Sequence, residues 1–180
     1  MRLKLYEESQ VYRFYSSTTF PWPVQATGYM RALMLRSAEL HRSDPPDIED
    51  AIRVRVDRQR LLDDGTRRAA ILVEESALRA QPFPRDVMRE QLNRLLVMMR
   101  RPNVSLGVVP TQGRRVQKPA ENFHLYDEVQ VFIELLTAAV TITQPREIAL
   151  YVQLFEDLAA DAVYGRKARA LINAAMEFLD

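Results

Sequence analysis

One stretch of the sequence, RPNVSLGVVP at residues 101–110, constrains the fold more than any other, because the hydrophobic period changes there within two residues. Before it, residues 83–101 repeat apolar side chains at intervals of three and four, which predicts an amphipathic helix packed against a core. The apolar positions of that helix are Met88, Leu92, Leu95 and Met99. Pro102 cannot continue a helix and Asn103 tolerates a turn, so the helix is expected to end here.

After this turn the chain has the pattern of a β-strand. Val104, Leu106 and Val108 alternate with other residues until Pro110 ends the pairing. A short apolar run at residues 70–73 predicts an earlier strand. Strand, helix and strand within about 40 residues indicate a βαβ unit with a right-handed crossover, in which the two strands are parallel.

The first 65 residues are expected to be mainly helical. Residues 3–15 are interpreted as a short helix, and residues 24–41 as a longer one with Tyr29, Leu33 and Leu40 at helical spacing. Between these helices, the two prolines of FPWP at residues 20–23 exclude a helix interior and predict an extended link.

A third helix is expected to begin near SDPPDIED and to end at Gly65. Ser43 or Asp44 can cap its first amides, and the acidic residues that follow complement the helix dipole. Its inner stripe is Ile48, Ile52, Val56 and Gln59. Gln59 therefore places an amide group on an otherwise apolar face.

Residues 122–143 predict three further strands. A three-residue loop at 127–129 keeps the apolar side chains of the first two strands on one face, pairing His124 with Phe132 and Asn122 with Glu134. The last strand, residues 138–143, is expected to turn Val140 and Ile142 inward. Helical patterns follow from Pro145 to about Ala160 and from Lys167 to Leu179.

These elements define an α+β fold with a mixed, roughly five-stranded sheet that contains the βαβ unit and is flanked by N-terminal and C-terminal helices. The chain of 180 residues is expected to form a single domain. Its parts would be a helical N-terminal part (1–65), the sheet with one covering helix (66–143) and the C-terminal helices (144–180). We expect one shared apolar interior.

Composition excludes several kinds of function. The absence of cysteine removes disulfides, thiolate catalysis and cysteine-ligated zinc, and with no signal peptide or apolar span it indicates a cytoplasmic protein without membrane contact. Phosphate-binding loops, dinucleotide fingerprints, HExxH and GxSxG are missing, so we expect no metal and no cofactor.

Residues 1–120 hold 21 Lys and Arg against 14 Asp and Glu, whereas residues 121–180 hold 4 against 10. Because acidic residues are mixed through the basic part, DNA binding by this chain alone is not expected.

One sheet face offers polar groups that could do chemistry. Asn122, His124, Tyr126 and Glu134 fall on the same side of the predicted strands. If no helix covered them fully, they would form a cavity wall in which His124, Glu134 and Tyr126 are candidates for general acid or base catalysis. The alternative is an ordinary solvent-facing side of a sheet. Trp22 is either a core or interface anchor or a surface for ligand stacking.

The order of motifs resembles the C-terminal domain of unknown function found in actinobacterial helix-turn-helix regulators described as antitoxin-like. The resemblance covers nearly the whole chain and rests on FPWPVQATGYMRAL, DRQRLL, EESALRA, MREQLNRLL and RPNVSLGVVP, with Phe123, Glu134, Tyr151 and Phe155 further on. The residues that match within the motifs are Phe20, Pro21, Gln25, Tyr29, Arg31, Arg58, Gln59, Glu75, Ala77, Leu78, Arg79, Gln91, Leu92, Asn103, Val104 and Pro110.

Two departures from the family pattern change what the resemblance implies. The family's proline-glycine-leucine-leucine-glutamine-threonine turn becomes PWPVQA at residues 21–26, which brings in the large indole of Trp22 and a second proline. The regulators also carry a helix-turn-helix module ahead of this domain, and no room for one exists before Tyr6. DNA binding is therefore not carried over to this chain.

The resemblance implies a regulatory domain that binds a small molecule or a protein partner, and we expect a homodimer. Its expected ligand-binding residues are Trp22, Gln25, Tyr29, Arg58, Gln59 and Gln91, which would hold the domain together or line its pocket. The alternative is an enzyme of small-molecule biosynthesis, cyclase-like or isomerase-like, with an apolar pocket beside Trp22. A third interpretation is an accessory nucleic-acid binder that uses Arg114, Arg115 and Lys118.

Overall fold

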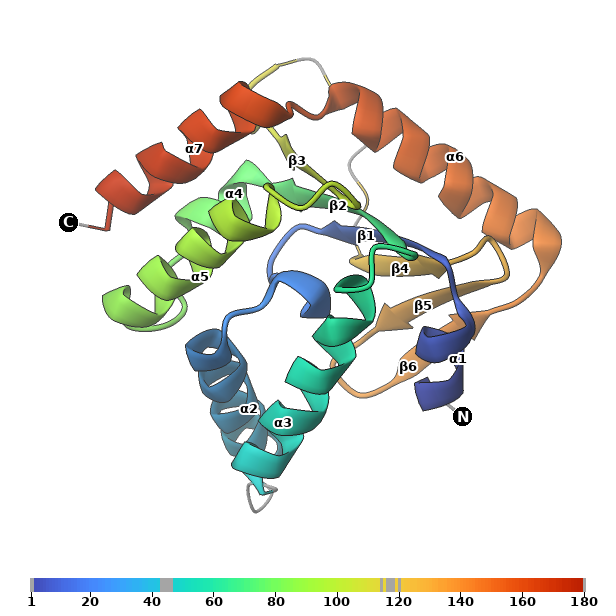
Figure 1. The fold of residues 1–180 in the computed structure, drawn as a ribbon, viewed down its shortest axis with the longest axis horizontal. Coiled ribbons are helices and arrows are strands. Elements are labelled where there is room, and N and C mark those ends of the chain that lie inside the picture. Colours follow the sequence, from blue (N-terminus) through green and yellow to red (C-terminus); the bar gives the residue numbers. More distant parts are fainter. Residues whose placement is uncertain (1, 43–46, 114, 116–118, 120, 180) are drawn as a thin grey trace.

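The computed structural model describes residues 2–42, 47–113, 115, 119 and 121–179 (Figure 1). The helices are α1 (Arg2–Glu8), α2 (Thr27–His41), α3 (Ile48–Gln59), α4 (Glu75–Arg79), α5 (Arg85–Met98), α6 (Pro145–Asp161) and α7 (Gly165–Glu177), with 3-10 turns η1 (Trp22–Val24) and η2 (Arg60–Leu62). The strands are β1 (Val11–Ser16), β2 (Arg68–Glu74), β3 (Val104–Val109), β4 (Phe123–Tyr126), β5 (Gln130–Glu134) and β6 (Ala139–Ile142).

The six strands form one mixed sheet in the order β3-β2-β1-β4-β5-β6. The pairs β1–β2 and β2–β3 are parallel, and every pair from β1 through β4 and β5 to β6 is antiparallel. The predicted βαβ unit is confirmed, since Ala69 pairs with Val104 in the parallel β2–β3 ladder. The connection from β1 to β2 and the connection from β2 to β3 both place their helices on the same face of the sheet (Figure 1). Two right-handed connections that step along the sheet in the same direction must do so.

The predicted helix over residues 3–15 is wrong in its second half. The helix α1 ends at Glu8, and β1 then runs through the middle of the sheet between β2 and β4. Tyr12, Phe14 and Tyr15 are all fully buried, so both faces of this strand lie in the core. A strand buried on both faces loses the alternation of apolar and polar residues that marks a strand in a sequence.

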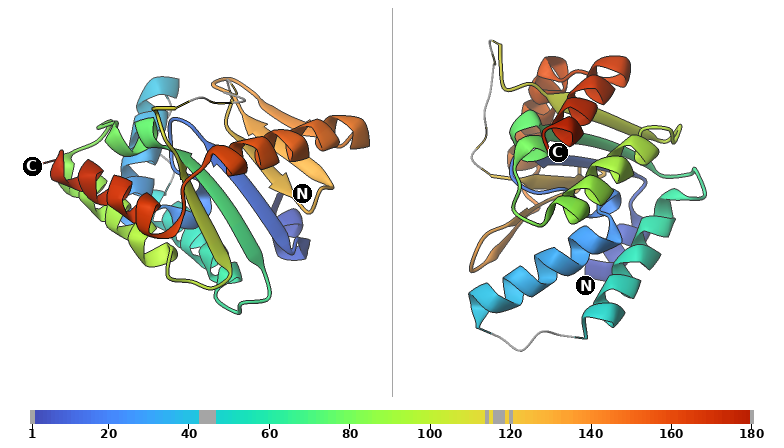
Figure 2. Two further views of the ribbon diagram at one scale, coloured as in Figure 1. Left: turned by 90° about the horizontal axis from the view of Figure 1, so that it is seen from above. Right: turned by 90° about the vertical axis from the view of Figure 1, so that its left-hand side faces the viewer.

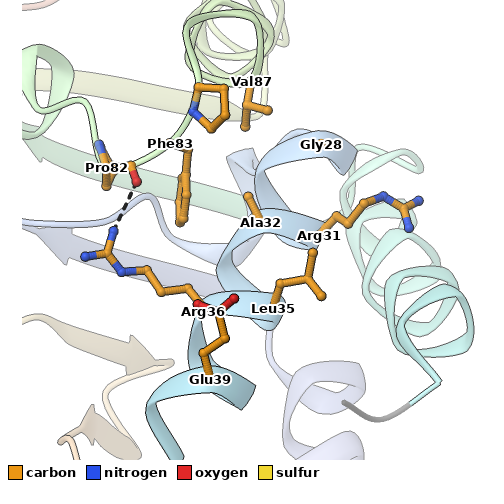
Figure 3. Close-up of a pocket in the computed structure, with 10 residues that line it drawn as sticks. Gly28, Arg31, Ala32, Leu35, Arg36, Glu39, Pro82, Phe83 and Val87 are labelled. Atoms are coloured by element: carbon orange, nitrogen blue, oxygen red, sulfur yellow. Dashed lines mark hydrogen bonds between the residues drawn. The ribbon is translucent and has the colours of Figure 1, made fainter. Parts of the chain in front are cut away.

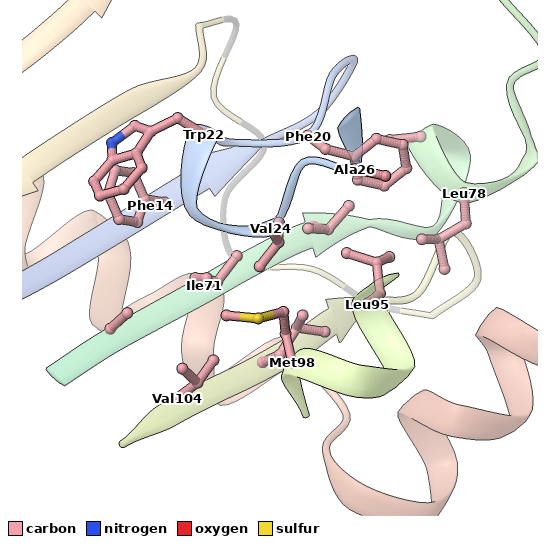
Figure 4. Packing of buried hydrophobic residues seen from close by; sticks show 14 of the residues in the cluster. Phe14, Phe20, Trp22, Val24, Ala26, Ile71, Leu78, Leu95, Met98 and Val104 are labelled. Carbon is pink, nitrogen blue, oxygen red and sulfur yellow. The ribbon is translucent and has the colours of Figure 1, made fainter. Parts of the chain in front are cut away.

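The sheet divides the core into two layers, so the expectation of one shared interior is wrong. On one face, Phe14, Ile71 and Leu106 pack against η1, α5 and α7 (Figure 4). On the other face, Leu72 and Leu125 pack against α6. Figure 2 shows α6 crossing the sheet, with α5 and α7 side by side, and these two helices also contact each other directly.

Helices α2 and α3 form a pair that extends from the first of these faces (Figure 1). Met30, Met34 and Ile52 make a small apolar cluster between the two helices. Leu40, which the helical spacing placed with Tyr29, is instead 62% exposed. Helix α3 has the predicted amphipathic stripe, including a buried Gln59.

The start of α3 is capped by Asp47, whose Oδ1 accepts a hydrogen bond from the Asp50 backbone N–H at 3.1 Å. The caps proposed from the sequence, Ser43 and Asp44, lie outside the described residues. The acidic first turn of the helix, with Glu49 and Asp50, is as predicted. It complements the positive end of the helix dipole.

The antiparallel part of the sheet has the predicted register. His124 pairs with Phe132 across a loop of three residues. The second expected pair does not form, because β4 begins at Phe123 and Asn122 instead binds the loop after β1. The Asn122 Oδ1 accepts from the backbone N–H of Ser17 at 2.7 Å and from its hydroxyl at 3.0 Å.

Candidate functional site

Three buried glutamines hold the backbone of residues 20–26. The Gln91 amide makes two of these bonds: its Oε1 accepts from the Ala26 N–H at 2.8 Å, and its Nε2 donates to the Val24 carbonyl at 2.8 Å. Gln25 donates from Nε2 to the Phe20 carbonyl at 2.6 Å. A buried backbone group without a partner is costly, so these amides stabilise a segment whose only regular structure is the short 3-10 turn η1.

Gln59 reaches the same segment from the end of α3. Its Nε2 donates to the carbonyls of Trp22 at 2.7 Å and Gln25 at 2.9 Å, and its Oε1 accepts from the Arg94 guanidinium at 3.1 Å. The glutamines expected to bind a ligand therefore bond to groups of the chain itself. The structure places them in a frame around residues 20–26.

An aromatic cluster lies beside this frame, between β1, β4, α1 and η1. The Trp22 ring packs edge-on against Tyr6, Tyr12 and Phe14, with centroid distances from 5.6 to 6.1 Å. The Arg58 guanidinium lies over the Tyr6 ring, 4.1 Å from its centroid. Trp22 is thus an anchor of the core, and Arg58 covers the cluster from α3 through a cation–π contact.

His124 and Tyr126 belong to this cluster, so the predicted polar sheet face is neither solvent-facing nor an open cavity wall. The His124 ring lies 4.8 Å from Phe14 and 6.0 Å from Phe132 between centroids, and its Nδ1 is buried without a hydrogen bond. Burial lowers the pKa of His124 to about 4, so the imidazole is neutral near pH 7. Burial also raises the pKa of Tyr126 far above its ordinary value, and nearby Tyr6 adds to the rise.

Glu134, the third catalytic candidate, lies apart from His124 and Tyr126. Glu134 ends β5 on the exposed surface, whereas Tyr126 is 1% exposed and His124 packs among aromatic rings. Tyr29 lies apart from all three, with its ring centroid 5.2 Å from those of Phe20 and Phe83. Burial raises the pKa of Tyr29 to about 12, although a hydrogen bond with the Phe20 backbone lowers it in part. The sequence-predicted residues therefore do not converge on one reactive point.

A groove that the sequence did not predict runs between α2 and the start of α5 (Figure 3). This open groove has a volume of about 630 Å³, within the range of ligand sites in proteins. One face of α2 forms the first wall, and the segment from Pro82 to Val87 forms the second. Its lining residues are Gly28, Arg31, Ala32, Leu35, Arg36, Glu39, Pro82, Phe83, Pro84 and Val87.

The floor of the groove is apolar and its rim is charged. Leu35 is 42% exposed, and in Figure 3 it lies on α2 near Arg31, with Ala32 between it and the ring of Phe83. The Arg36 guanidinium donates to the Pro82 carbonyl at 3.0 Å and lies 5.9 Å from the Phe83 ring centroid. Arg31 is bound by Glu49 of α3. These contacts hold the side chains of Arg31 and Arg36 at the rim and leave the apolar floor of the groove exposed.

A second cavity of about 450 Å³ lies at the carboxyl ends of β2 and β3. Glu74, 3% exposed, binds Arg115 through two hydrogen bonds of 2.6 and 3.0 Å and accepts a third from the Tyr15 hydroxyl. Glu75 accepts from the Thr111 N–H at 3.0 Å and pairs with Arg79. Both carboxylates are therefore used to attach the chain that follows β3.

Arg115, one of the three cations expected to bind nucleic acid, is engaged within the protein. Arg115 is largely buried in its ion pair with Glu74, so its guanidinium does not face a phosphate backbone. Arg114 and Lys118 lie outside the described residues. Within the described part of the chain, no three side chains of metal-ligating type come together, and no helix combines the length and apolar character of a membrane span.

Together these features define an α+β domain built on a six-stranded mixed sheet, with polar residues engaged in internal bonds and an open groove on one side. Residues 3–174 match the family model described as "Domain of unknown function (DUF5753)", and the chain belongs to this family. No curated protein sequence matches the chain.

One similar solved structure is reported as "Structure of TrmBL2, an archaeal chromatin protein, shows a novel mode of DNA binding". It shares 18% sequence identity with this chain, with a TM-score of 0.40. The likeness covers 89% of this chain and 47% of that one, so this chain spans about half the length of the chromatin protein.

Proposed function

We propose that this chain is a regulatory partner-binding domain, and that the groove between α2 and α5 receives an amphipathic helical segment of another protein. The observation that carries the proposal is the continuous face of α2 from Gly28 to Glu39, which lines the groove along its whole length. These twelve residues are separated by eleven rises of about 1.5 Å, so the face extends about 16 Å, or three turns. Helices dock into such grooves through apolar side chains on one face.

The chemistry of the groove supports a protein segment as its occupant. Ala32, Leu35, Phe83 and Val87 are the apolar lining residues labelled in Figure 3, and the groove is open to solvent. Arg31, Arg36 and Glu39 along the rim present both signs of charge. Apolar anchors in the centre with a polar rim are the usual anatomy of a protein interface.

The enzymatic alternative has weaker support. The two cavities described above are lined by residues other than Trp22, His124 and Glu134. His124 and Tyr126 lie within the aromatic cluster, and Glu134 is on the surface. The geometry therefore favours binding over catalysis.

Photocrosslinking in the cells that produce the protein tests the proposed function. A benzoylphenylalanine placed at Leu35 is expected to form a crosslinked species of higher mass than the 20.9 kDa chain. The matched control is the same residue at Val97, an apolar side chain of α5 that is 51% exposed and does not line the groove. We expect the crosslink at Leu35 to be lost when Phe83 is changed to Glu in the same chain.

Equal crosslinking at both positions would show nonspecific contact and contradict the proposal. A crosslink from Leu35 to a second copy of the chain alone would also contradict it, because the groove would then be occupied by self-association. Unfolding curves of the variants establish that each remains folded before its crosslinks are compared.

A further inference from the structure

The two outer edges of the sheet are treated differently. The β3 edge is covered by the α6–α7 connection: Val108 and Val163 exchange backbone hydrogen bonds of 2.9 and 2.8 Å. The Tyr164 ring lies against Gly107 on the same strand. This contact occupies the outward backbone groups of Val108 and so blocks pairing with another chain at that end of the strand.

The β6 edge is open in the part of the chain that the structure describes, since β6 is the last strand of the sheet and pairs there only with β5. The hairpin closes with a hydrogen bond of 2.9 Å from the Leu135 N–H to the Ala138 carbonyl. Because bonded and non-bonded pairs alternate in an antiparallel ladder, Val140 and Ile142 bond inward to β5. The backbone groups of Ala139 and Thr141 then point outward, away from the sheet.

This edge lacks the usual protection against pairing. Residues 135–144 contain no charged side chain, and no proline interrupts the strand. Exposed apolar side chains lie along it: Leu135 (49%), Leu136 (67%) and Val140 (39%), with Val129 (61%) in the neighbouring turn. The sequence predicted Val140 to turn inward, but its place on the last strand leaves it partly uncovered. Natural sheets normally place lysines, prolines or bulges on an edge of this kind.

We propose that β6 pairs antiparallel with β6 of a second copy of this chain, joining two six-stranded sheets across a two-fold axis. This surface is separate from the groove and does not depend on its function. An antiparallel pair of identical strands is isologous, so the contact closes after two copies. The contact between Val108 and Val163 already blocks one end of the β3 edge, so this pairing would cover the sheet edge that has no such contact among the described strands.

The distribution of charge and apolar groups favours a second copy as the occupant. Glu134 lies at one end of the uncharged run and Arg146 at the other. Antiparallel pairing brings the Glu134 end of each copy toward the Arg146 end of the other, whereas parallel pairing would bring like charges together. It also brings the Leu135 and Leu136 turn of one copy toward the Val129 turn of the other. Each end of the β6 edge in one copy would thus cover apolar side chains at the opposite end of the edge in the other copy.

Sedimentation equilibrium on the whole chain tests the proposal. We expect the wild-type chain to reach twice its mass of 20.9 kDa at micromolar concentration. Thr141→Pro removes one outward N–H and leaves the bonds to β5 in place, so it should raise the dimer dissociation constant at least about tenfold, the equivalent of losing about 1.4 kcal/mol. Thr141→Val changes only the side chain and should dimerise like the wild type.

A monomeric wild-type chain at high concentration would overturn the proposal, and so would a dimer that Thr141→Pro leaves intact. A spin label gives a second measurement that does not require the proline variant to fold. The chain has no cysteine, so Thr143→Cys supplies a unique attachment site. Labels at this position should give a short distance between copies and labels at a Val97→Cys control a long one, and the reverse order would overturn the proposal.

Discussion

At the scale of single residues, the polar side chains that match the family pattern serve mainly as clamps on the backbone. Gln91, Gln59 and Gln25 hold residues 20–26, and the Asn103 amide donates to the carbonyls of Leu62 and Arg67 at 2.9 Å. The sequence could predict that Gln59 lies on an apolar stripe. It could not predict the partners of these amides, because they lie on segments brought together only by the tertiary fold.

Replacing Gln91 with Leu should destabilise the protein by about 3 kcal/mol. The Ala26 N–H and the Val24 carbonyl would remain buried without partners, at about 1–3 kcal/mol each. Unfolding in urea measures the change. The control is Gln153→Leu on α6, where the exposed amide bonds only to Asp157 among the contacts described, and its effect should stay within about 0.5 kcal/mol. Equal effects of the two substitutions would refute the clamp role of Gln91.

His124 should make stability depend on pH. Its pKa is lowered by burial to about 4 in the folded chain, against about 6.5 in an unfolded one. Between these values the unfolded state binds a proton that the folded state does not. Stability is therefore highest above pH 6.5 and falls as the pH drops toward 4, by at most about 1.4 kcal/mol per pH unit.

Urea unfolding at several pH values between 4 and 7 measures this slope. His124→Phe keeps an aromatic ring beside Phe14 and Phe132 and should flatten the part of the slope due to the imidazole. The control is Val97→Phe at an exposed, uncharged position of α5, which should leave the slope as it is in the wild type. An unchanged slope in His124→Phe would show that other groups control the response to acid.

At the scale of helices and strands, the sequence predicts an element well when one of its faces is polar. It predicts an element poorly when both faces are buried. The end of α5 and the start of β3 follow from Pro102 and the change of period, and the β4–β5 hairpin follows from alternation. The strand β1 was missed because its buried residues are aromatic on both faces. Its central position comes from pairing with β2 and β4, which local patterns do not contain.

The covered edge of β3 depends on a residue without a side chain. A Cβ added at Gly107 would lie 2.7 Å from a ring carbon of Tyr164 and 3.0 Å from a methyl of Leu72. Gly107→Ala should therefore destabilise the protein by about 1–3 kcal/mol through overpacking, measured by thermal or urea unfolding. In the background of Tyr164→Ala the same change should cost clearly less. Equal costs in both backgrounds would mean that the ring does not press on β3.

At the scale of the whole molecule, the fold class was predictable but the groove was not. The α+β class, the parallel unit and the C-terminal helices follow from periodicity and from breaking residues. The groove joins one face of α2 to residues 82–87, and its width depends on how α2 and α5 pack. Leu35 and Phe83 carry a weak signal in the sequence, since Leu35 lies outside the buried stripe of α2 and Phe83 is a large apolar residue in the loop before α5.

The central strand of the sheet is also the first to be synthesised. Tyr12 pairs with Ala69 on one side and with Tyr126 on the other, so β1 has no neighbour while the early chain leaves the ribosome. The sheet can close only after Tyr126 has emerged. Folds whose contacts lie far apart along the chain form slowly. The most aromatic strand of the sheet therefore gains its second neighbour only after β4 has been synthesised.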